Sequence, residues 1–439
     1  MDTFQQRRAW LEQQLDSDSV VILVGNTAKT RSKNIKYHFR ADNDLYYMTG
    51  FTEPDAVAVL RPGHPQAFVL FVRPNDAAAE TSFGTRAGLP GAKTLFNADQ
   101  SYAIDDLERE LPELLMGRSK VYYHDEQGIY SDRIIDWLNQ QRRSTGFDII
   151  KEYRQLLPLA PILHNKRVFK SKEEIILIRR AVKASSVAHK KVMASIKPGM
   201  NERQLSAIFD REIAEYDCFE VCYPSIVASG NNACCLHYED NNCTVRDGQM
   251  LLIDAGAEYR FYCSDITRSY PVNGRFSKEQ ARLYQLVLDA LDAAIAKVEP
   301  GLSWDVIYQT CMQVMAKGLI ELGLLSGSLE QVMADESYRE FTVHKTGHWL
   351  GMDVHDVGAY HDKDGNWLSL QPNMVFTIEP GIYIPEHCQT VDEKWRGIGI
   401  RIEDDILVTA SGHENLSRAI PRSVKEIESF MAASQTGLN

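Results

Sequence analysis

The chain has 439 residues with 48 basic and 60 acidic side chains, so its formal net charge is −12. This acidic excess argues against nucleic acid or an anionic membrane as the main partner, and no run of 18 apolar residues predicts a transmembrane helix. The polar N-terminus lacks the pattern of a signal peptide, and the eight cysteines form no Cys-x-x-Cys pair. We therefore expect a cytoplasmic protein whose thiols are reduced and structural.

Short apolar runs alternate with helical stretches over residues 1–165, which predicts an α/β domain. The predicted strands are residues 20–24, 57–60, 68–72 and 121–123, and the clearest helices are residues 104–115 and 131–141. Two prolines within residues 156–161 indicate a linker between this domain and a second one, residues 166–439. The first domain contains no candidate catalytic group, so we expect it to shape a cleft and to form subunit contacts.

The second domain shows one order of elements twice, which predicts a repeated helix–helix–sheet unit. The first copy consists of helices 171–198 and 201–216 and strands 225–228 and 250–255, and the second of helices 277–298 and 303–322 and strands 374–378 and 398–407. Ser171, Asn201 and Ser303 are the predicted N-caps. In each copy a Pro-Gly pair separates the two helices, and the pairs lie 102 residues apart, at Pro198-Gly199 and Pro300-Gly301.

Two aspartates follow the apolar strands of the first copy. Asp254 ends the run 250–254, and Asp265 comes eleven residues later. A hairpin turn at residues 258–261 would make them cross-strand neighbours, with Cβ atoms about 5 Å apart. Carboxylates so close repel each other unless a cation lies between them. The alternative is a solvated turn with one exposed aspartate, but the apolar run before Asp254 favours a buried site.

The second copy contributes two glutamates. Glu379 ends the apolar run 375–378, and alternation over residues 397–403 places Arg401 and Glu403 on the face that also carries Gly397 and Gly399. An edge strand with a charged, wet face would give the same pattern. Two glycines on that face indicate instead that another segment approaches closely.

Four histidines, His344, His348, His355 and His361, fall within 18 residues of a loop-like segment, and His237 follows another glycine-containing loop. His344 and His348 have the spacing of a zincin helix, but Lys345 replaces the required glutamate. Four carboxylates with one or two imidazoles suit two divalent ions such as manganese, cobalt or zinc. Two ions about 3.5–4 Å apart activate water and polarise a carbonyl.

These residues resemble the dinuclear metallopeptidases of the pita-bread (creatinase/aminopeptidase) family, and within it the bacterial Xaa-Pro aminopeptidases (aminopeptidase P). The motifs that carry the resemblance are Asp254-Ala-Gly-Ala, Ser264-Asp-Ile-Thr-Arg, Gly347-His-Trp-Leu-Gly, Asp353-Val-His-Asp-Val-Gly, Glu379-Pro-Gly-Ile-Tyr and Gly399-Ile-Arg-Ile-Glu-Asp-Asp. Residues 43–57 are similar to the aminopeptidase P N-terminal domain. The resemblance implies an α+β fold class, with a pseudo-two-fold pita-bread domain after an α/β domain.

The resemblance also implies a role for each site residue. Asp254 would bind one metal, Asp265 and Glu403 would bridge both, and His348 and Glu379 would hold the second. Glu379 would also act as general base. The other implied members, which bind substrate, move protons or orient ligands, are His237, His344, His355, Tyr383 and Arg401.

The implied activity is removal of the N-terminal residue from peptides with proline in second position. The alternatives are prolidase, which cleaves only Xaa-Pro dipeptides, and a non-catalytic binding module that has lost its metals. The implied cofactor is two divalent ions, most simply manganese, and the implied assembly is a homotetramer or homodimer. Lys345, where the family often has glycine, and the loop 359–373 leave the substrate preference open.

Overall fold

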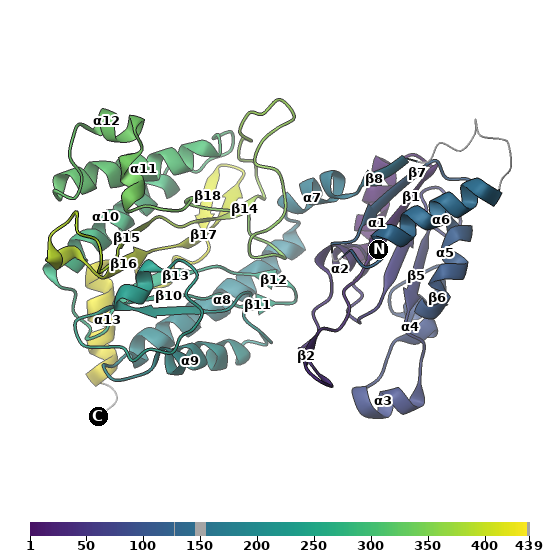
Figure 1. The fold of residues 1–439 in the computed structure, drawn as a ribbon, viewed down its shortest axis with the longest axis horizontal. Coiled ribbons are helices and arrows are strands. Elements are labelled where there is room, and N and C mark those ends of the chain that lie inside the picture. The colour runs from purple at the N-terminus through teal and green to yellow at the C-terminus, as the bar shows by residue number, and fades with distance from the viewer. Residues whose placement is uncertain (127, 145–154, 437–439) are drawn as a thin grey trace. The chain divides into compact units, whose positions relative to one another are not determined.

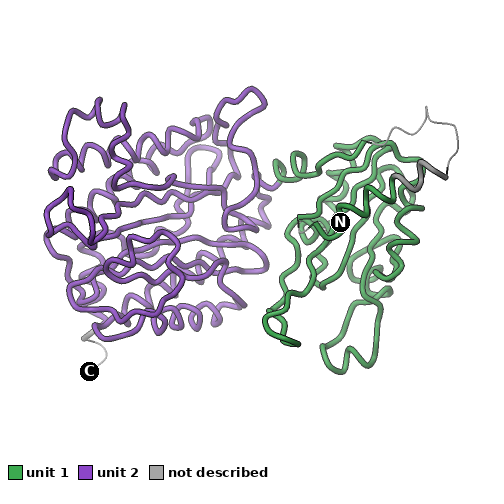
Figure 2. The backbone as a smooth tube through the Cα atoms, in the orientation of Figure 1, with its two compact units in different colours: residues 1–166 green, residues 167–439 purple. Residues whose placement is uncertain are grey.

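The computed structural model describes residues 1–126, 128–144 and 155–436, with side chains left out at 139–144 and 435–436. The chain forms two compact units, Met1–Lys166 and Arg167–Asn439 (Figure 2). Within the described part, no helix has the length and apolar character needed to cross a bilayer. All eight cysteines are free thiols.

Unit 1 is built on a mixed six-stranded sheet with the strand order β6-β5-β4-β1-β7-β8. Its strands are β1 (Ser19–Val24), β4 (Val57–Leu60), β5 (Phe68–Val72), β6 (Gln100–Ala103), β7 (Lys120–His124) and β8 (Gln155–Pro158), with a small β2–β3 hairpin (Thr30–Ser32, Ile35–Lys36) outside the sheet. Its helices are α1 (Thr3–Gln14), α2 (Asn43–Thr49), α3 (Ala77–Phe83), α4 (Gly88–Thr94), α5 (Leu107–Leu115) and α6 (Ser131–Ser144). The predicted helix 104–115 begins with a 3₁₀ turn, Ile104–Asp106, before α5. Strands β1, β4 and β5 are fully buried, which explains their continuous apolar runs.

The predicted linker at residues 156–161 is wrong. Residues 156–158 belong to β8, which pairs in parallel with β7 at the sheet edge, and helix α7 (Ala160–Val168) follows at once. Pro158 ends an edge strand and Pro161 lies in the first turn of α7, two places where a missing N–H is tolerated. His164 of this helix contacts Asp44 of α2, with Nε2 and Oδ2 2.8 Å apart.

Unit 2 contains the repeat that the sequence predicts (Figure 1). The first copy has α8 (Lys172–Ser195), α9 (Glu202–Ala214) and a three-stranded sheet β13-β10-β9 (Thr267–Pro271, Met250–Asp254, Ile226–Ser229), with the hairpin β11–β12 (Glu258–Tyr259, Tyr262–Cys263). The second has α10 (Lys278–Ile295), α11 (Asp305–Glu321), α12 (Leu329–Ala334) and the sheet β14-β17-β18 (Val375–Ile378, Asp404–Thr409, Gly412–Asn415), with the pair β15–β16 (Gly381–Ile384, Ile398–Arg401). Helix α13 (Val424–Thr436) follows.

The two Pro-Gly junctions have the same backbone structure. In each, the amide two residues after proline donates to the carbonyl before it, Met200 to Lys197 at 3.3 Å and Leu302 to Glu299 at 3.2 Å. Gly199 and Gly301 have φ values of 91° and 92°, as the third position of a type II turn requires. Both glycine amides also bond a distant strand-like segment, at the carbonyls of residues 245 and 370. These shared bonds identify the two copies as one structural unit used twice.

Two details of the second copy differ from prediction. The predicted strand 398–407 is two strands, β16 and β17, which join different sheets because the chain breaks its pairing at Ile402 and Glu403. Ser303 does not cap α11; its hydroxyl bonds the Asp305 carboxylate at 2.5 Å, and Trp304 occupies the N-cap position. Ser171, Asn201 and Ser277 cap their helices with complete capping boxes.

The repeat predicts equal costs for alanine at the two turn glycines. A Cβ at Gly199 or Gly301 would meet no atom within 4 Å. Gly199→Ala and Gly301→Ala should therefore lower the free energy of unfolding only by the cost of a positive φ at alanine, about 1 kcal/mol each. Denaturant unfolding of each variant measures this loss. Asparagine tolerates positive φ better, so Gly199→Asn and Gly301→Asn serve as controls with smaller losses. A neutral alanine variant at either position would contradict the shared turn.

Candidate metal centre

The β11–β12 hairpin places Asp254 and Asp265 near each other. The predicted turn is confirmed, but the predicted register is wrong: residues 260 and 261 form the tip, so Asp254 pairs with Thr267 rather than with Asp265. The two carboxylates nevertheless share a partner, because the Tyr223 hydroxyl lies 2.7 Å from Asp254 Oδ1 and 2.5 Å from Asp265 Oδ1. One hydroxyl proton serves only one oxygen at a time, so this arrangement needs a further positive charge or proton.

Glu403 joins the aspartates because the second copy packs against β13. The Glu403 amide donates to the Thr267 carbonyl at 3.1 Å, and the Thr267 hydroxyl donates to Glu403 Oε2 at 2.7 Å. Glu403 is only 1% exposed, which excludes the wet edge strand. The predicted close approach is present: a Cβ on Gly399 would lie 2.3 Å from the carbonyl oxygen of Ala233, in the 3₁₀ turn Gly230–Cys234.

His348 faces the carboxylates through Nε2. Its Nδ1 contacts the Trp349 carbonyl at 3.0 Å, so Nδ1 carries a proton and Nε2 is the nitrogen that a metal ion would take. Nε2 lies 3.4 Å from Asp265 Oδ2 and 3.7 Å from Glu379 Oε1. Ligand atoms of Asp265, His348 and Glu403 all lie within 4.8 Å of one another. Glu379 is held at the end of β14, where its amide donates to the Thr346 carbonyl at 3.0 Å.

Arg401 connects the carboxylates to the pocket histidine. Its guanidinium donates to Asp254 Oδ2 at 2.6 Å, to the Thr267 hydroxyl at 3.1 Å and to the Tyr383 hydroxyl at 2.9 Å. The Tyr383 hydroxyl lies 2.7 Å from His344 Nε2, and His344 Nδ1 lies 2.7 Å from the Lys345 carbonyl. Since that carbonyl only accepts, Nδ1 is protonated and Tyr383 donates to Nε2. Burial lowers the pKa of His344 to about 4, so its ring is neutral at pH 7.

The electrostatics of the centre call for cations. Burial, followed by the charges of Asp265, Glu379 and Asp254, raises the pKa of Glu403 well above its usual range. Burial also raises the pKa of Glu379 to about 7 and raises that of Asp254. Divalent ions would favour the ionised form of all four carboxylates. The donor set, with oxygens from four carboxylates and one imidazole nitrogen, therefore fits a pair of hard or borderline divalent ions.

The centre opens into a cavity of about 510 Å³. Its polar walls include the five candidate ligands together with His237, His344, His355 and Arg401, and its apolar walls include Ile226, Leu236, Val354, Trp304, Tyr360 and Trp367. The His355 ring packs edge-on against His348 with centroids 4.3 Å apart. His361 lies outside this lining and packs against Trp367 instead, with ring centroids 3.9 Å apart and ring planes tilted by 36°. Tyr383 does not line this cavity; it joins the site through its hydrogen bonds with Arg401 and His344.

Sequence reasoning missed a buried layer beneath the ligands. Tyr223 and Thr267 contact the ligand carboxylates directly, and the Asp405 carboxylate accepts the Asp265 amide at 3.2 Å. Below them Arg268, which is not exposed at all, pairs with Asp404 at 2.6 Å and donates to the Glu403 carbonyl at 2.5 Å. The Arg after Thr267 and the paired Asp404-Asp405 after Glu403 were the available signal, since charged residues next to buried strands need partners.

Comparisons with known proteins show the family to which the chain belongs. Residues 176–410 match the metallopeptidase family M24, and residues 4–122 match the aminopeptidase P N-terminal domain. The chain is 38% identical to the Xaa-Pro aminopeptidase of Escherichia coli K12, covering 98% of each. It is similar to the structure of Pseudomonas aeruginosa aminopeptidase PepP, with TM-score 0.96, 41% identity and coverage of 99% and 98%. It is also similar to zinc-substituted E. coli aminopeptidase P in complex with product, with TM-score 0.94, 38% identity and 98% coverage of both.

The coverage of these matches extends over both units and includes every candidate ligand. The pita-bread fold with a preceding α/β domain, predicted from the motifs, is confirmed by the same structures. The chain therefore belongs to metallopeptidase family M24 and carries the N-terminal domain of the aminopeptidase P branch.

Proposed function

We propose that the chain is an Xaa-Pro aminopeptidase, which hydrolyses the bond between an N-terminal residue and a proline in second position. The observation that carries this proposal is the convergence of three buried carboxylates, the half-buried Glu379 and His348 on one cavity. The match to Xaa-Pro aminopeptidase along nearly the whole chain favours this activity over prolidase. A binding module without metals is disfavoured because all five candidate ligands are present.

The substrate explains why such a site is needed. The bond before proline is a tertiary amide without an N–H group, and the φ angle of proline is fixed. A peptidase that binds its substrate through a hydrogen bond from that N–H therefore cannot use it here. Two divalent ions, when bound, polarise the scissile carbonyl and lower the pKa of water. The apolar walls at Ile226, Leu236 and Val354 suit the proline ring and the apolar part of the first residue.

The proposed ligand roles are those that the family resemblance implies, and the five side chains line one cavity. Asp254 would hold one ion, Asp265 and Glu403 would bridge both, and His348 and Glu379 would hold the second. Arg401 donates a hydrogen bond to the Asp254 carboxylate, and its two other hydrogen bonds, to Thr267 and Tyr383, fix the orientation of the guanidinium group. Asp265 has its own support, since Asp405 accepts its amide hydrogen.

Proton movement would involve Glu379 and three histidines. Glu379 takes a proton from the attacking water as general base, and the leaving proline nitrogen must gain one. Glu379 Oε2 lies 3.7 Å from His344 Nδ1. His237 and His355 line the same cavity and complete the polar groups available to the substrate. We assign Tyr383 to substrate binding together with these histidines, because its hydroxyl fixes the His344 ring.

Manganese is the proposed native metal, supported by the oxygen-rich donor set; cobalt and zinc are the alternatives. The family resemblance further predicts a homodimer or homotetramer, which sedimentation velocity measures directly. The acidic composition and the reduced thiols are the basis for proposing a cytoplasmic location.

The choice between aminopeptidase and prolidase is tested with matched peptides. Chelator-stripped protein should cleave neither Ala-Pro nor Ala-Pro-Ala. Addition of manganese should restore release of alanine from Ala-Pro-Ala, measured by chromatography of the products, and parallel additions of cobalt and zinc rank the metals. Rapid cleavage of Ala-Pro with refusal of Ala-Pro-Ala would replace the proposal by prolidase. No cleavage with any of the three metals would contradict both activities.

The positioning role of Arg401 predicts a loss of activity even when charge is kept. Lysine offers a single donor group in place of the planar guanidinium that serves Asp254, Thr267 and Tyr383 together. Arg401→Lys should lower metal affinity or kcat by about 10- to 100-fold, the usual effect of substituting a residue that hydrogen-bonds a metal ligand. Metal content by elemental analysis and steady-state rates separate these two effects.

The matched control for Arg401→Lys is Arg246→Lys, since Arg246 is exposed and lies outside the cavity lining. This control should match the unsubstituted protein in rate and metal content. Full activity and full metal content in Arg401→Lys would remove Arg401 from the proposed machinery.

A further inference from the structure

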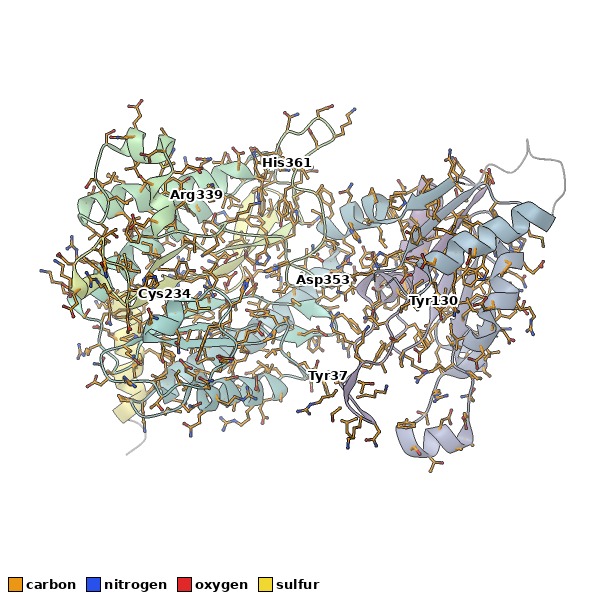
Figure 3. All side chains as sticks on the ribbon, in the orientation of Figure 1. Tyr37, Tyr130, Cys234, Arg339, Asp353 and His361 are labelled. Atoms are coloured by element: carbon orange, nitrogen blue, oxygen red, sulfur yellow. The ribbon has the colours of Figure 1, made fainter. Side chains whose placement is uncertain are left out.

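A second cavity of about 400 Å³ adjoins the metal centre within unit 2. The two cavities share five wall residues, which are Trp304, His344, Lys345, Gly347 and Trp367. The second cavity extends away from the carboxylates, toward Tyr308 on α11 and toward Arg339. In the view of Figure 3, Arg339 and His361 lie on the side of unit 2 that carries α11 and α12. A peptide that continues beyond its proline needs such a space.

Lys345 lies at the junction of the two cavities with its backbone fixed. Its carbonyl accepts the His344 Nδ1 proton, and the next residue's carbonyl accepts the Glu379 amide. The Lys345 residue is exposed, and among the described residues no carboxylate oxygen approaches its Nζ within the 4.0 Å of an ion pair. The backbone of Lys345 is therefore held by hydrogen bonds to residues of the metal centre, while its ammonium group remains available to a ligand.

The other charges of the second cavity already have partners. Arg339 pairs with Glu336, with Nε and Oε2 2.8 Å apart, and the Asp305 carboxylate accepts the Ser303 hydroxyl at 2.5 Å. Both ring nitrogens of His344 have partners, the Lys345 carbonyl and the Tyr383 hydroxyl. Lys345 is therefore the remaining positive charge on this wall, among the residues that the structure describes.

Trp367 adds an apolar surface beside Lys345. Its side chain is 39% exposed although it is large and apolar. A tight turn holds it: the Asp362 amide donates to the Asn366 carbonyl at 2.8 Å, a strand-like bridge joins His361 to Trp367, and the two rings pack against each other. An exposed aromatic ring held in place beside an available ammonium group is suited to a short peptide segment that ends in an anion.

We propose that the second cavity binds the peptide residue that follows proline, and that Lys345 binds a carboxylate carried by that residue. The carboxylate is either the C-terminus of a tripeptide or an acidic side chain in third position. In an extended chain the carboxylate carbon of the third residue lies about 7 Å from the proline nitrogen, and Lys345 lines both the cavity of the metal centre and the second cavity. The inference rests on the proposed Xaa-Pro aminopeptidase activity and deepens it.

The test compares peptides that differ only in that charge. The substrates are Ala-Pro-Ala with a free carboxylate, Ala-Pro-Ala-amide, and Ala-Pro-Asp-amide, and the readout is kcat/KM for release of alanine by manganese-loaded protein. The unsubstituted protein should prefer each of the two anionic peptides over Ala-Pro-Ala-amide by about two- to fivefold, the range for an exposed ion pair, mainly through KM. A preference for only one anionic peptide identifies which carboxylate Lys345 binds.

Substitutions then assign the preference to Lys345. In Lys345→Met the ratio of acid to amide should fall to near one, and in Lys345→Arg it should be retained. The ratio is measured within each variant, so a general change in activity does not alter it. Lys191→Met, at an exposed position on α8 outside both cavities, should keep the preference of the unsubstituted protein.

Two outcomes separate the inference from the activity on which it rests. Equal rates for all three peptides, or an acid preference that survives in Lys345→Met, would overturn the role of Lys345 while leaving the aminopeptidase intact. Failure to cleave any of the three peptides would instead overturn the aminopeptidase proposal.

Discussion

The structure of unit 2 depends on one electrostatic constraint, the crowding of four carboxylates, three buried and one half-buried, around a single cavity. Desolvation alone would drive these groups to their neutral forms, as the raised pKa of Glu403 and Asp254 shows. The chain counters this with cationic and hydrogen-bonding groups around the carboxylates: although burial would raise the pKa of Asp265, its contact with His348 keeps that pKa below the usual range. Arg401 neutralises one side of Asp254, and Arg268 holds the backbone beneath Glu403. The open side of the carboxylates is left for ions.

The same constraint explains the layered order of the site. The outermost layer is the histidines of the cavity wall, the next is the carboxylates, and the deepest is the fully buried pair of Arg268 and Asp404. Breaking a buried pair leaves an uncompensated charge, which is far more costly than losing an exposed one. The deepest layer therefore fixes the positions of the ligands with little freedom.

The sequence predicted the repeat and the ligand-bearing strand ends because both are local patterns. Asp254 and Glu379 follow apolar runs, and the Pro-Gly pairs mark matching turns. The hairpin register was not readable, because Arg260 and Phe261 adopt positive φ values of 48° and 72° at its tip without the glycine or asparagine that signals such a turn. Tyr223 and Asp405 escaped notice for another reason: they become site residues only through contacts between segments distant in the chain. The linker was misread because prolines also fit strand and helix ends.

The contact between the two copies has a consequence for how the protein acquires its metals. The bonds from Arg401 to Asp254 and from Glu403 to Thr267 join residues 147 and 136 positions apart. Neither copy alone contains a full ligand set, so a growing chain exposes no competent binding site until almost all of unit 2 has been synthesised. Long-range closure of this kind comes late in folding. A complete set of ligands for two ions therefore exists only once the two copies have packed against each other.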